Sequence, residues 1–374
     1  MRSHRANRVA SSDAQEQEQA QVRGGLRRSL RSSALRNRSA ARMWKVTALV
    51  AAILAAASWL SLTSGAFDLS VADTVKTLLR IDRTPEHHLV VFEFRLPRIV
   101  LGMLIGFSLG IAGSVIQGIT RNGLADPGIL GINAGAGLAI VLFMFLLQGK
   151  MATTGWSAVM TMPLFGLAGG LAAAVLIYLF ARERGSLDGQ RLILVGIAIA
   201  SGFGALTVYV SLKMNPNDYE MAVVWLAGSI YSANWKFVVA VLPPLLLFAP
   251  IVWLRAYRLN LFQLQEQSAV SLGVPVEREK NVLLLASVGL VGASVAVSGS
   301  VGFVGLIAPH IARRLVGLQH RRSIPISGLA GAAMVVTADF IGKTLFAPAE
   351  LAVGIVISMI GVPYFIYLLM RARG

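Results

Sequence analysis

Three short motifs contain residue types that could do chemistry, and each lacks a partner that its chemistry needs. "IGKT" (341–344) resembles the end of a phosphate-binding loop, but Thr337 stands where that loop requires its first glycine. "EHH" (86–88) could touch a metal ion, but adjacent histidines point apart on a helix and no other histidine is near in sequence. His310 lies in an apolar run, where packing or a hydrogen bond is the commoner role. The sequence predicts no nucleotide site, no metal site and no cofactor.

The carboxylates give little support to catalysis or to ion coupling. Hydrolytic chemistry needs paired carboxylates, or a nucleophile beside its base, and no such set is visible. Ion-coupled carriers keep ionisable groups inside the membrane, because groups that are so costly there are retained for function. Only Asp339 lies well within a hydrophobic run, while Asp126 and Glu350 lie at run ends, and packing or capping accounts for each. We expect a chain that is not an enzyme and that takes its energy from a partner.

The elements that position these residues are long hydrophobic helices. Apolar residues make up 55% of the 374 and charged residues only 14%, with a mean hydropathy of +0.67, whereas soluble domains carry about 25% charged residues. A helix needs about 20 apolar residues to cross a hydrocarbon core about 30 Å thick. We therefore predict an all-α polytopic membrane protein with ten transmembrane helices, near 46–66, 96–117, 126–147, 157–181, 190–212, 236–254, 282–299, 303–318, 324–346 and 350–370. Glycines inside these runs, as in "GMLIGFSLGIAG" (102–113), let membrane helices approach closely.

A basic tail precedes the membrane domain. Residues 1–45 carry eleven basic and three acidic residues, which is half of the net charge of +16, and they show no apolar period. We predict a disordered tail over 1–45 and a ten-helix domain over 46–372. The tail could be a positive-inside anchor, a segment that binds anionic lipid, or the product of a misassigned start before Met43, with a twin-arginine export signal at "RRSL" (27–30) as the weakest alternative. Because the charge is concentrated in the tail and the loops, it does not indicate nucleic acid.

Charge also predicts the topology. With both termini in the cytoplasm, twenty-five basic residues fall on the inner side and nine on the outer side, as the positive-inside rule requires. The outer loop 67–95 is unusually basic, so it either meets an acidic partner or is simply solvated. "GLADPGI" (123–129) and "GLIAPHI" (305–311) share the spacing G-L-x-x-P-x-I, and the first begins the third span from the inside while the second begins the eighth from the outside. Spans 2–5 and 7–10 would then form an inverted repeat, a common plan in transporters.

The stretch "NLFQLQEQSAVSLGVPVEREKN" (260–281) is the longest polar interruption in the second half of the chain. "QEQSAVSL" (265–272) can form a helix, Gly273 suits its C-terminal cap, and Pro275 prevents continuation. On the predicted topology this stretch faces the cytoplasm. A helix lying on the lipid surface is the simpler alternative, but the stretch is short and acidic for that role.

Three long stretches resemble the permease family of iron-chelate and cobalamin ATP-binding-cassette importers, the FecCD type. They are "FRLPRIVLGMLIGFSLGIAGSVIQGITRNGLADPGILGINAGAG" (94–137), "SGSVGFVGLIAPHIARRLVG" (298–317) and "LFAPAELAVGIVISMIGVPYFIYLLMR" (345–371). The resemblance covers about 46–372. It implies a multi-pass subunit of the bacterial inner membrane, working as a homodimer or paralogous heterodimer with cytoplasmic ATP-binding subunits. A periplasmic or lipoprotein binding protein would deliver the metal chelate. An iron–siderophore complex is the commonest cargo, with cobalamin or haem, or an ion-coupled secondary transporter, as alternatives.

The resemblance also implies where the partners dock. In that family the segment between spans six and seven enters the ATPase cleft, which here gives the coupling residues Glu266, Ala269, Val270, Leu272 and Gly273. Basic residues of the first outer loop and the end of span nine receive acidic groups of the binding protein, which here gives Arg80, Arg83 and Lys343, with Lys76 as a substitute in the loop. Such charges would mainly set docking rate and register.

Overall fold

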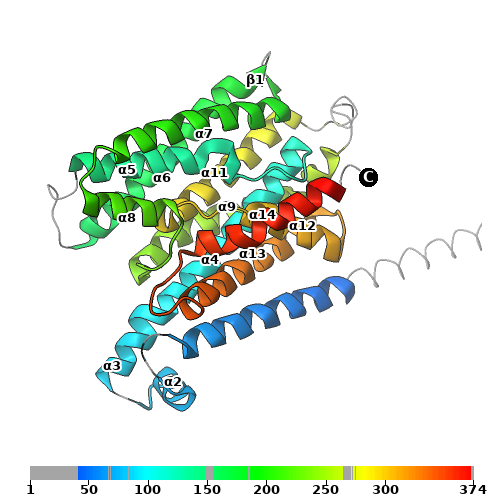
Figure 1. Cartoon of the computed structure of the whole chain (residues 1–374). Helices are drawn as coiled ribbons and strands as arrows, with labels where there is room; N and C mark the ends of the chain where they lie inside the picture. The colour runs from blue at the N-terminus through cyan, green and yellow to red at the C-terminus, as the bar shows by residue number, and fades with distance from the viewer. Residues whose placement is uncertain are drawn as a thin grey trace, which may run out of the picture. The chain divides into compact units, whose positions relative to one another are not determined.

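The computed structural model describes residues 41–147 (except 66, 68 and 83) and 155–371 (except 184, 185, 264–270, 272 and 274). Residues 49–374 form one compact unit. Its described part is almost entirely helical, and the helices lie side by side (Figure 1). The exception is a pair of two-residue antiparallel strands, β1 (Arg182–Glu183) and β2 (Ser186–Leu187). The expectation of an all-α polytopic membrane protein is confirmed at this level.

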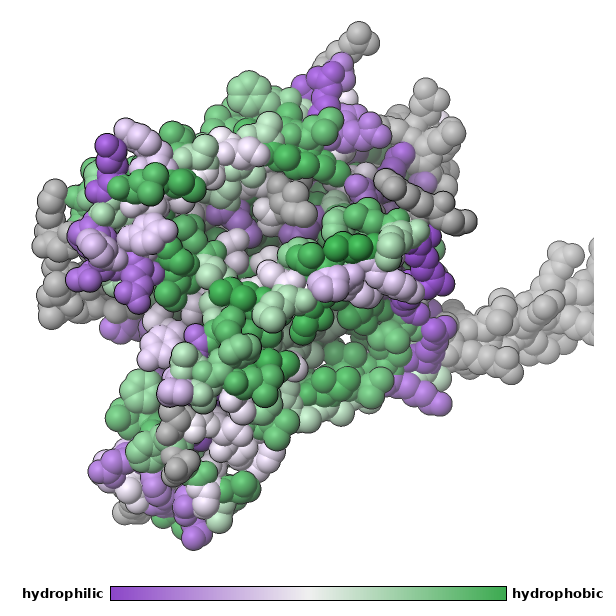
Figure 2. Space-filling view, in the orientation of Figure 1, coloured by the Kyte–Doolittle hydropathy of each residue, from purple (hydrophilic) through white to green (hydrophobic). Residues whose placement is uncertain are grey.

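Eight described helices are long and apolar enough to cross a membrane. The first helix (Ala41–Thr63) is followed by a continuous helical run, Pro85–Thr120, in which α3 (Pro85–His88) and the π-helix η1 (Leu89–Arg95) lead into α4 (Leu96–Thr120). The others are α6 (Gly155–Ala181), α7 (Gly189–Ser211), α9 (Trp235–Leu261), α11 (Val276–Ser298), α13 (His320–Thr344) and α14 (Val353–Arg371). Figure 2 shows apolar side chains over the middle of the helices and hydrophilic ones gathered toward their ends.

Two predicted spans are shorter than expected. The span predicted at 126–147 is divided into η2 (Gly128–Ile132) and α5 (Asn133–Leu147), because Gly131 has a φ of +85° that breaks the helix. The span predicted at 303–318 is α12 (Val304–Val316). At 1.5 Å per residue these helices are about 22 and 20 Å long, less than the hydrocarbon thickness of about 30 Å. The ten predicted spans thus correspond to ten helices, and ten crossings with both termini cytoplasmic stay a prediction.

Two short helices lie in segments where the sequence analysis predicts no helix. In α2 (Val71–Leu78), the Ser70 hydroxyl caps the helix by accepting from the backbone N–H of Asp73 at 3.1 Å. In α8 (Pro216–Leu226), the side-chain oxygen of Asn215 caps the helix by accepting from the backbone N–H of Asp218 at 2.9 Å. Their N-terminal caps, and in α2 the helical spacing of Val71, Val75 and Leu78, were signals that could have indicated them.

Glycines of α4 place this helix in direct backbone contact with α12 and α13. A Cβ atom added at Gly106 would lie 2.3 Å from the Gly331 carbonyl oxygen, and one added at Gly113 would lie 1.9 Å from that of Gly305. Between them, the Ser327 hydroxyl of α13 donates to the Gly110 carbonyl at 2.7 Å. Separations this short leave no room for a side chain, as the glycine pattern predicts. α4, α12 and α13 therefore form the closely packed centre of the domain.

Candidate functional site

The loop between α11 and α12, residues 299–303, joins helices that are far apart in sequence. Just before it, the Ser298 carbonyl accepts from the N–H of Ser229 at 2.8 Å. Within it, the Ser300 hydroxyl accepts from the Asn133 side-chain amide at 3.0 Å. The neighbouring α8–α9 loop is bonded onward to α14, because the Gly354 N–H donates to the Gly228 carbonyl at 2.9 Å. The loop is thus connected to α5, to the α8–α9 loop and, through that loop, to α14.

Two glycines make this junction possible. Gly299 has a φ of +69°, and a Cβ atom there would lie 1.9 Å from the carbonyl oxygen of Trp225. Gly228 has a φ of +77°, and a Cβ atom there would lie 2.5 Å from the carbonyl oxygen of Ser300. Both positions need glycine for its conformation and for its size. This accounts for the glycine at position 299 of "SGSVGF" (298–303).

The two G-L-x-x-P-x-I sequences meet in space. A Cβ atom at Gly305, in the second sequence, would lie 2.6 Å from Pro127 Cδ and 3.2 Å from Asp126 Oδ2, in the first. Gln117 of α4 donates to the Gly305 carbonyl at 3.3 Å and so lies beside the same contact. Segments related by a two-fold axis can meet on that axis, so this contact fits the inverted repeat, which stays a prediction.

A buried ion cluster connects α4, α13 and the loop before α14. Arg98 Nε lies 3.0 Å from both carboxylate oxygens of Asp339, and Arg98 Nη2 lies 2.8 Å from Asp339 Oδ1. The same Nη2 lies 2.8 Å from Glu350 Oε2. The Asp339 side chain is 5% exposed and that of Glu350 is 31% exposed. Asp339, the carboxylate predicted to lie inside a span, is therefore paired with an arginine. This pairing argues against a role of Asp339 in a proton relay.

Cavities lie on both sides of this cluster. One, of ≈ 540 Å³, is lined by Arg98, Tyr231 and Glu350 together with Val223 of α8. The other, of ≈ 790 Å³, shares those three charged and aromatic residues and extends toward Phe94. Arg98 also lies 5.8 Å from the centre of the Tyr231 ring, a cation–π distance. Volumes of this size are typical of small-molecule pockets, and Arg98, Tyr231 and Glu350 form the wall between them.

Of the three predicted docking residues, Lys343 is held by the domain itself. Lys343 Nζ donates to the carbonyl and to the hydroxyl of Ser61, at 2.5 and 2.8 Å. Arg95 similarly donates to the carbonyls of Leu62 and Phe67, both at 2.7 Å. These bonds fasten the C-terminal end of the first helix. The sequence "IGKT" thus forms the last turn of α13.

Arg80 is exposed and follows α2, with a φ of +57°, and Arg83 lies outside the described residues. Nearby, His87 Nδ1 lies 2.6 Å from Asp82 Oδ2, and Thr84 donates to the same carboxylate. These hydrogen bonds, led by the one from His87, hold the pKa of Asp82 well below its usual range. His87 is therefore paired with a carboxylate. Among the described residues, no group of three or more potential ligands could hold a metal ion.

At the other end of the domain, part of the predicted coupling segment 260–281 is described. Gly273 is exposed and has a φ of +78°, which is the left-handed conformation that its role as a cap requires. Glu266, Ala269, Val270 and Leu272 lie outside the described residues. The coupling role of all five stays a prediction.

The segment that follows Gly273 is anchored by ion pairs that sequence reasoning missed. Glu279, whose side chain is 2% exposed, pairs with Arg255 at 2.7 Å and with Arg258. Glu277 accepts from the Leu187 N–H of β2 at 2.8 Å and pairs with Lys280 at 3.1 Å. The sequence has basic residues just before the polar stretch, Arg255 and Arg258, and the acidic residue Glu279 near its end. This charge pattern could have indicated the ion pairs between them. These contacts give the end of the segment a fixed attachment to α9 and β2.

The geometry defines a class: a multi-pass membrane protein with cavities beside a buried ion cluster and with anchored polar segments at its helix ends. The chain belongs to the FecCD transport family, whose model matches residues 53–371. It is 54% identical over 331 residues to the iron-uptake system permease protein FeuC of Bacillus subtilis (strain 168), covering 88% of this chain and 98% of the relative. It is 42% identical over 328 residues to the iron(3+)-hydroxamate import system permease protein FhuG of the same organism, covering 88% and 97%.

A solved structure has the same fold. An inward-facing metal-chelate type ABC transporter matches with a TM-score of 0.75 and 30% identity, covering 87% of this chain and 99% of that one. With the eight long apolar helices, these likenesses identify a permease subunit of an ATP-binding-cassette importer in the bacterial inner membrane. The resemblance noted in the sequence is confirmed.

Proposed function

We propose that this permease subunit carries an iron–siderophore complex. The observation that carries the proposal is the 54% identity, over nearly the whole of both chains, to an iron-uptake system permease. The 42% identical relative is named for import of an iron(3+)-hydroxamate. Haem or cobalamin is the alternative cargo within the same family.

The complex that we propose contains two permease chains, cytoplasmic ATP-binding subunits and a separate binding protein that delivers the chelate. The second permease chain is a copy of this one or a paralogue. The chelate passes between α7 and α14 of the two chains. Two features support this path: Leu194, Ile197 and Leu206 of α7 are exposed, and a Cβ atom at Gly202 or Gly204 of the same helix would meet nothing within 4 Å. Surfaces that are apolar and open in one chain are suited to a partner and to a pathway.

Transport by the reconstituted complex tests the proposal. Proteoliposomes that contain this chain, its ATPase and its binding protein should accumulate radioiron supplied as a hydroxamate or catecholate siderophore, and only with ATP. The isolated chain should neither bind nor hydrolyse ATP. Uptake of labelled haem or cobalamin, and not of the siderophores, would show that haem or cobalamin is the cargo. Uptake driven by a proton gradient without ATP would contradict it.

A change at Gly273 tests the coupling segment. Gly273→Val should lower uptake strongly at normal membrane levels, because a left-handed conformation costs an L-residue about 1–2 kcal/mol and a β-branched one more. Gly273→Asn is the matched control, since asparagine tolerates this conformation.

Ala269→Arg should weaken ATPase docking by about 1–3 kcal/mol by burying an unpaired charge. Uptake and ATPase pull-down are measured together, and a variant Ala269→Arg that transports like wild type would place coupling elsewhere.

Charge reversal tests the outer loop. The double change Arg80→Glu with Arg83→Glu should weaken binding-protein docking, and the loss should be largest at low ionic strength, where exposed charges are least screened. Lys343 has to be tested alone, as Lys343→Gln, because it also fastens Ser61. Lys213→Glu is the control, since Lys213 lies over Tyr209 at 5.7 Å and belongs to another loop. Unchanged affinity of the double variant at low salt would exclude Arg80 and Arg83.

A further inference from the structure

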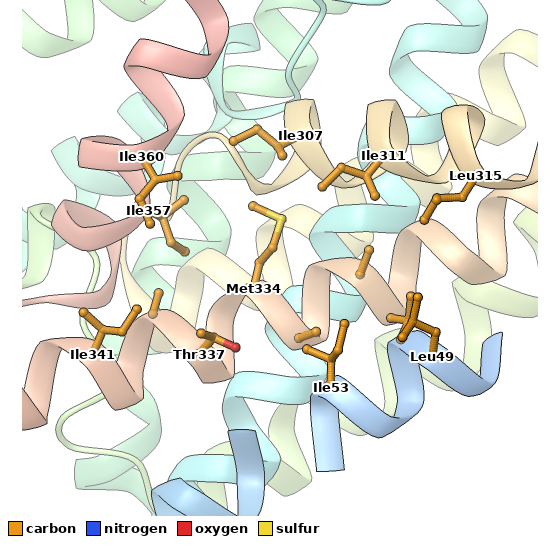
Figure 3. A pocket seen from close by; sticks show the side chains of 14 residues that line it. Leu49, Ile53, Ile307, Ile311, Leu315, Met334, Thr337, Ile341, Ile357 and Ile360 are labelled. Atoms are coloured by element: carbon orange, nitrogen blue, oxygen red, sulfur yellow. The ribbon is translucent and has the colours of Figure 1, made fainter. Parts of the chain in front are cut away.

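An apolar groove of ≈ 310 Å³ lies between the first helix and helices α12, α13 and α14. Figure 3 shows Leu49 and Ile53 on one side, Ile311 and Leu315 on another, and Met334 and Ile360 pointing into the space between them. Thirteen of the fourteen lining side chains are apolar, and Thr337 is the exception. The groove is therefore a site for a hydrocarbon group and not for water or a polar solute.

Polar bonds hold the first helix to the domain near its C-terminus, and the groove lies farther toward its N-terminus. Near its C-terminus, Ala57 and Leu62 pack in one cluster with Val336 of α13, and Lys343 and Arg95 bond to Ser61 and Leu62. Toward its N-terminus, Ile53 is 49% exposed and Leu49 is 56% exposed. Opposite them, α13 presents the small residues Ala330 and Ala333. The small side chains of α13 leave a space beside the first helix, where Val46 and Val50 are buried but Leu49 and Ile53 are exposed.

The dimensions fit one acyl chain. The lined part of α13 runs from Ala330 to Ile341, which is about 16 Å along the helix axis, or half of a hydrocarbon core about 30 Å thick. A partner helix at least 10 Å in diameter and of that length would occupy roughly 1,200 Å³, well above the groove volume. The groove therefore has no room for a whole helix of a second copy.

The charge at one end of the groove indicates the headgroup. Ile311 and Leu315 of α12 line the groove, and Arg314 lies on the same helical face at the end of α12, where it is exposed. A basic side chain beside a hydrocarbon site between membrane helices favours an anionic lipid.

We propose that this groove binds an anionic phospholipid, with one acyl chain between the first helix and α13 and the phosphate beside Arg314. The lipid fills the space that the first helix leaves open, restores the dispersion contacts that an empty space lacks, and so stabilises the N-terminal half of that helix. The site is independent of the cargo, because it lies apart from the cavities beside Arg98.

Native mass spectrometry of the detergent-purified full chain, incubated with phosphatidylglycerol or phosphatidylcholine, tests the proposal. Wild type should hold one phosphatidylglycerol more firmly than phosphatidylcholine. Arg314→Gln should weaken phosphatidylglycerol binding about fivefold, the effect of about 1 kcal/mol for one basic residue. Ile53→Trp and Ala333→Phe should abolish it, since both place a ring in the groove. Ile53 is half exposed, so Ile53→Trp keeps the test valid if Ala333→Phe does not fold.

Leu246→Phe is the matched control, because Leu246 of α9 is 68% exposed and lies outside the groove. It should bind phosphatidylglycerol like wild type. Phosphatidylglycerol binding that survives both groove variants would overturn the site. Equal binding of phosphatidylcholine would overturn the anionic headgroup. A disulfide formed between two copies of Ile53→Cys would show that a second chain, and not a lipid, covers the groove.

Discussion

Gly113→Leu is expected to abolish accumulation of the folded protein in the membrane. A Cβ atom at this position would lie 1.9 Å from the carbonyl oxygen of Gly305 and 2.6 Å from its Cα atom. Both are backbone atoms of α12, so the strain cannot be relieved by a change of rotamer. Overpacking of a well-packed interior costs about 1–3 kcal/mol and occasionally more, and a leucine against backbone belongs at the upper end or beyond. Gly113→Ala should already lower the unfolding temperature.

Gly202→Ala is the matched control for this prediction. A Cβ atom at Gly202 would meet nothing within 4 Å, and the residue lies inside α7, where alanine is favoured over glycine by about 1 kcal/mol. Size-exclusion chromatography of a fluorescent fusion after heating measures the folded fraction of each variant. If Gly113→Ala unfolds at the same temperature as Gly202→Ala and wild type, the contact between α4 and α12 is looser than in the structure.

Asp339→Leu is expected to destabilise the protein by about 3–5 kcal/mol, the usual result of removing one partner from a buried ion pair. The change leaves Arg98, 15% exposed, with only Glu350, 31% exposed, to neutralise it. Glu350→Gln is the control and should cost much less, because Arg98 keeps both of its Asp339 oxygens. The same thermal assay in detergent ranks the variants.

The double variant Arg98→Met with Asp339→Leu separates the destabilisation caused by an unpaired charge from that caused by altered packing. Because two apolar side chains of similar volume leave no unpaired charge between α4 and α13, the double variant should be more stable than Asp339→Leu alone. Equal stability of both variants would mean that the cluster matters through its packing and not through its charge.

The long helices could be predicted from the sequence because their signal is local: about 20 apolar residues in a row leave no alternative to a membrane helix. The interruption of the predicted span 126–147 could not, because it depends on the positive φ of Gly131, and Gly131 is one of many glycines in apolar runs. The positive φ of Gly273, by contrast, could be predicted from its neighbours in the sequence. A single glycine between a helix-forming stretch and a proline indicated its left-handed conformation, and the structure has it.

The ion cluster shows why partners of a site are harder to predict than its members. Asp339 was visible as a carboxylate inside a span, but Arg98 lies 241 residues away, and nothing local joins them. Lys343 was visible as a basic residue near the end of a span, but its bond to Ser61 spans 282 residues. Residue type indicates which side chains need a partner, and only the packing of the helices decides which partner each one has.

The backbone contacts of α4 also limit how this permease can move. Where glycines bring α4 against α12 and α13, no flexible side chain lies between the helices to absorb a rotation or a slide, because close-packed interiors do not deform gradually. We therefore expect these three helices to behave as a rigid body throughout alternating access. The displacement that opens one side and closes the other then falls on α7, whose Gly202 and Gly204 face open space.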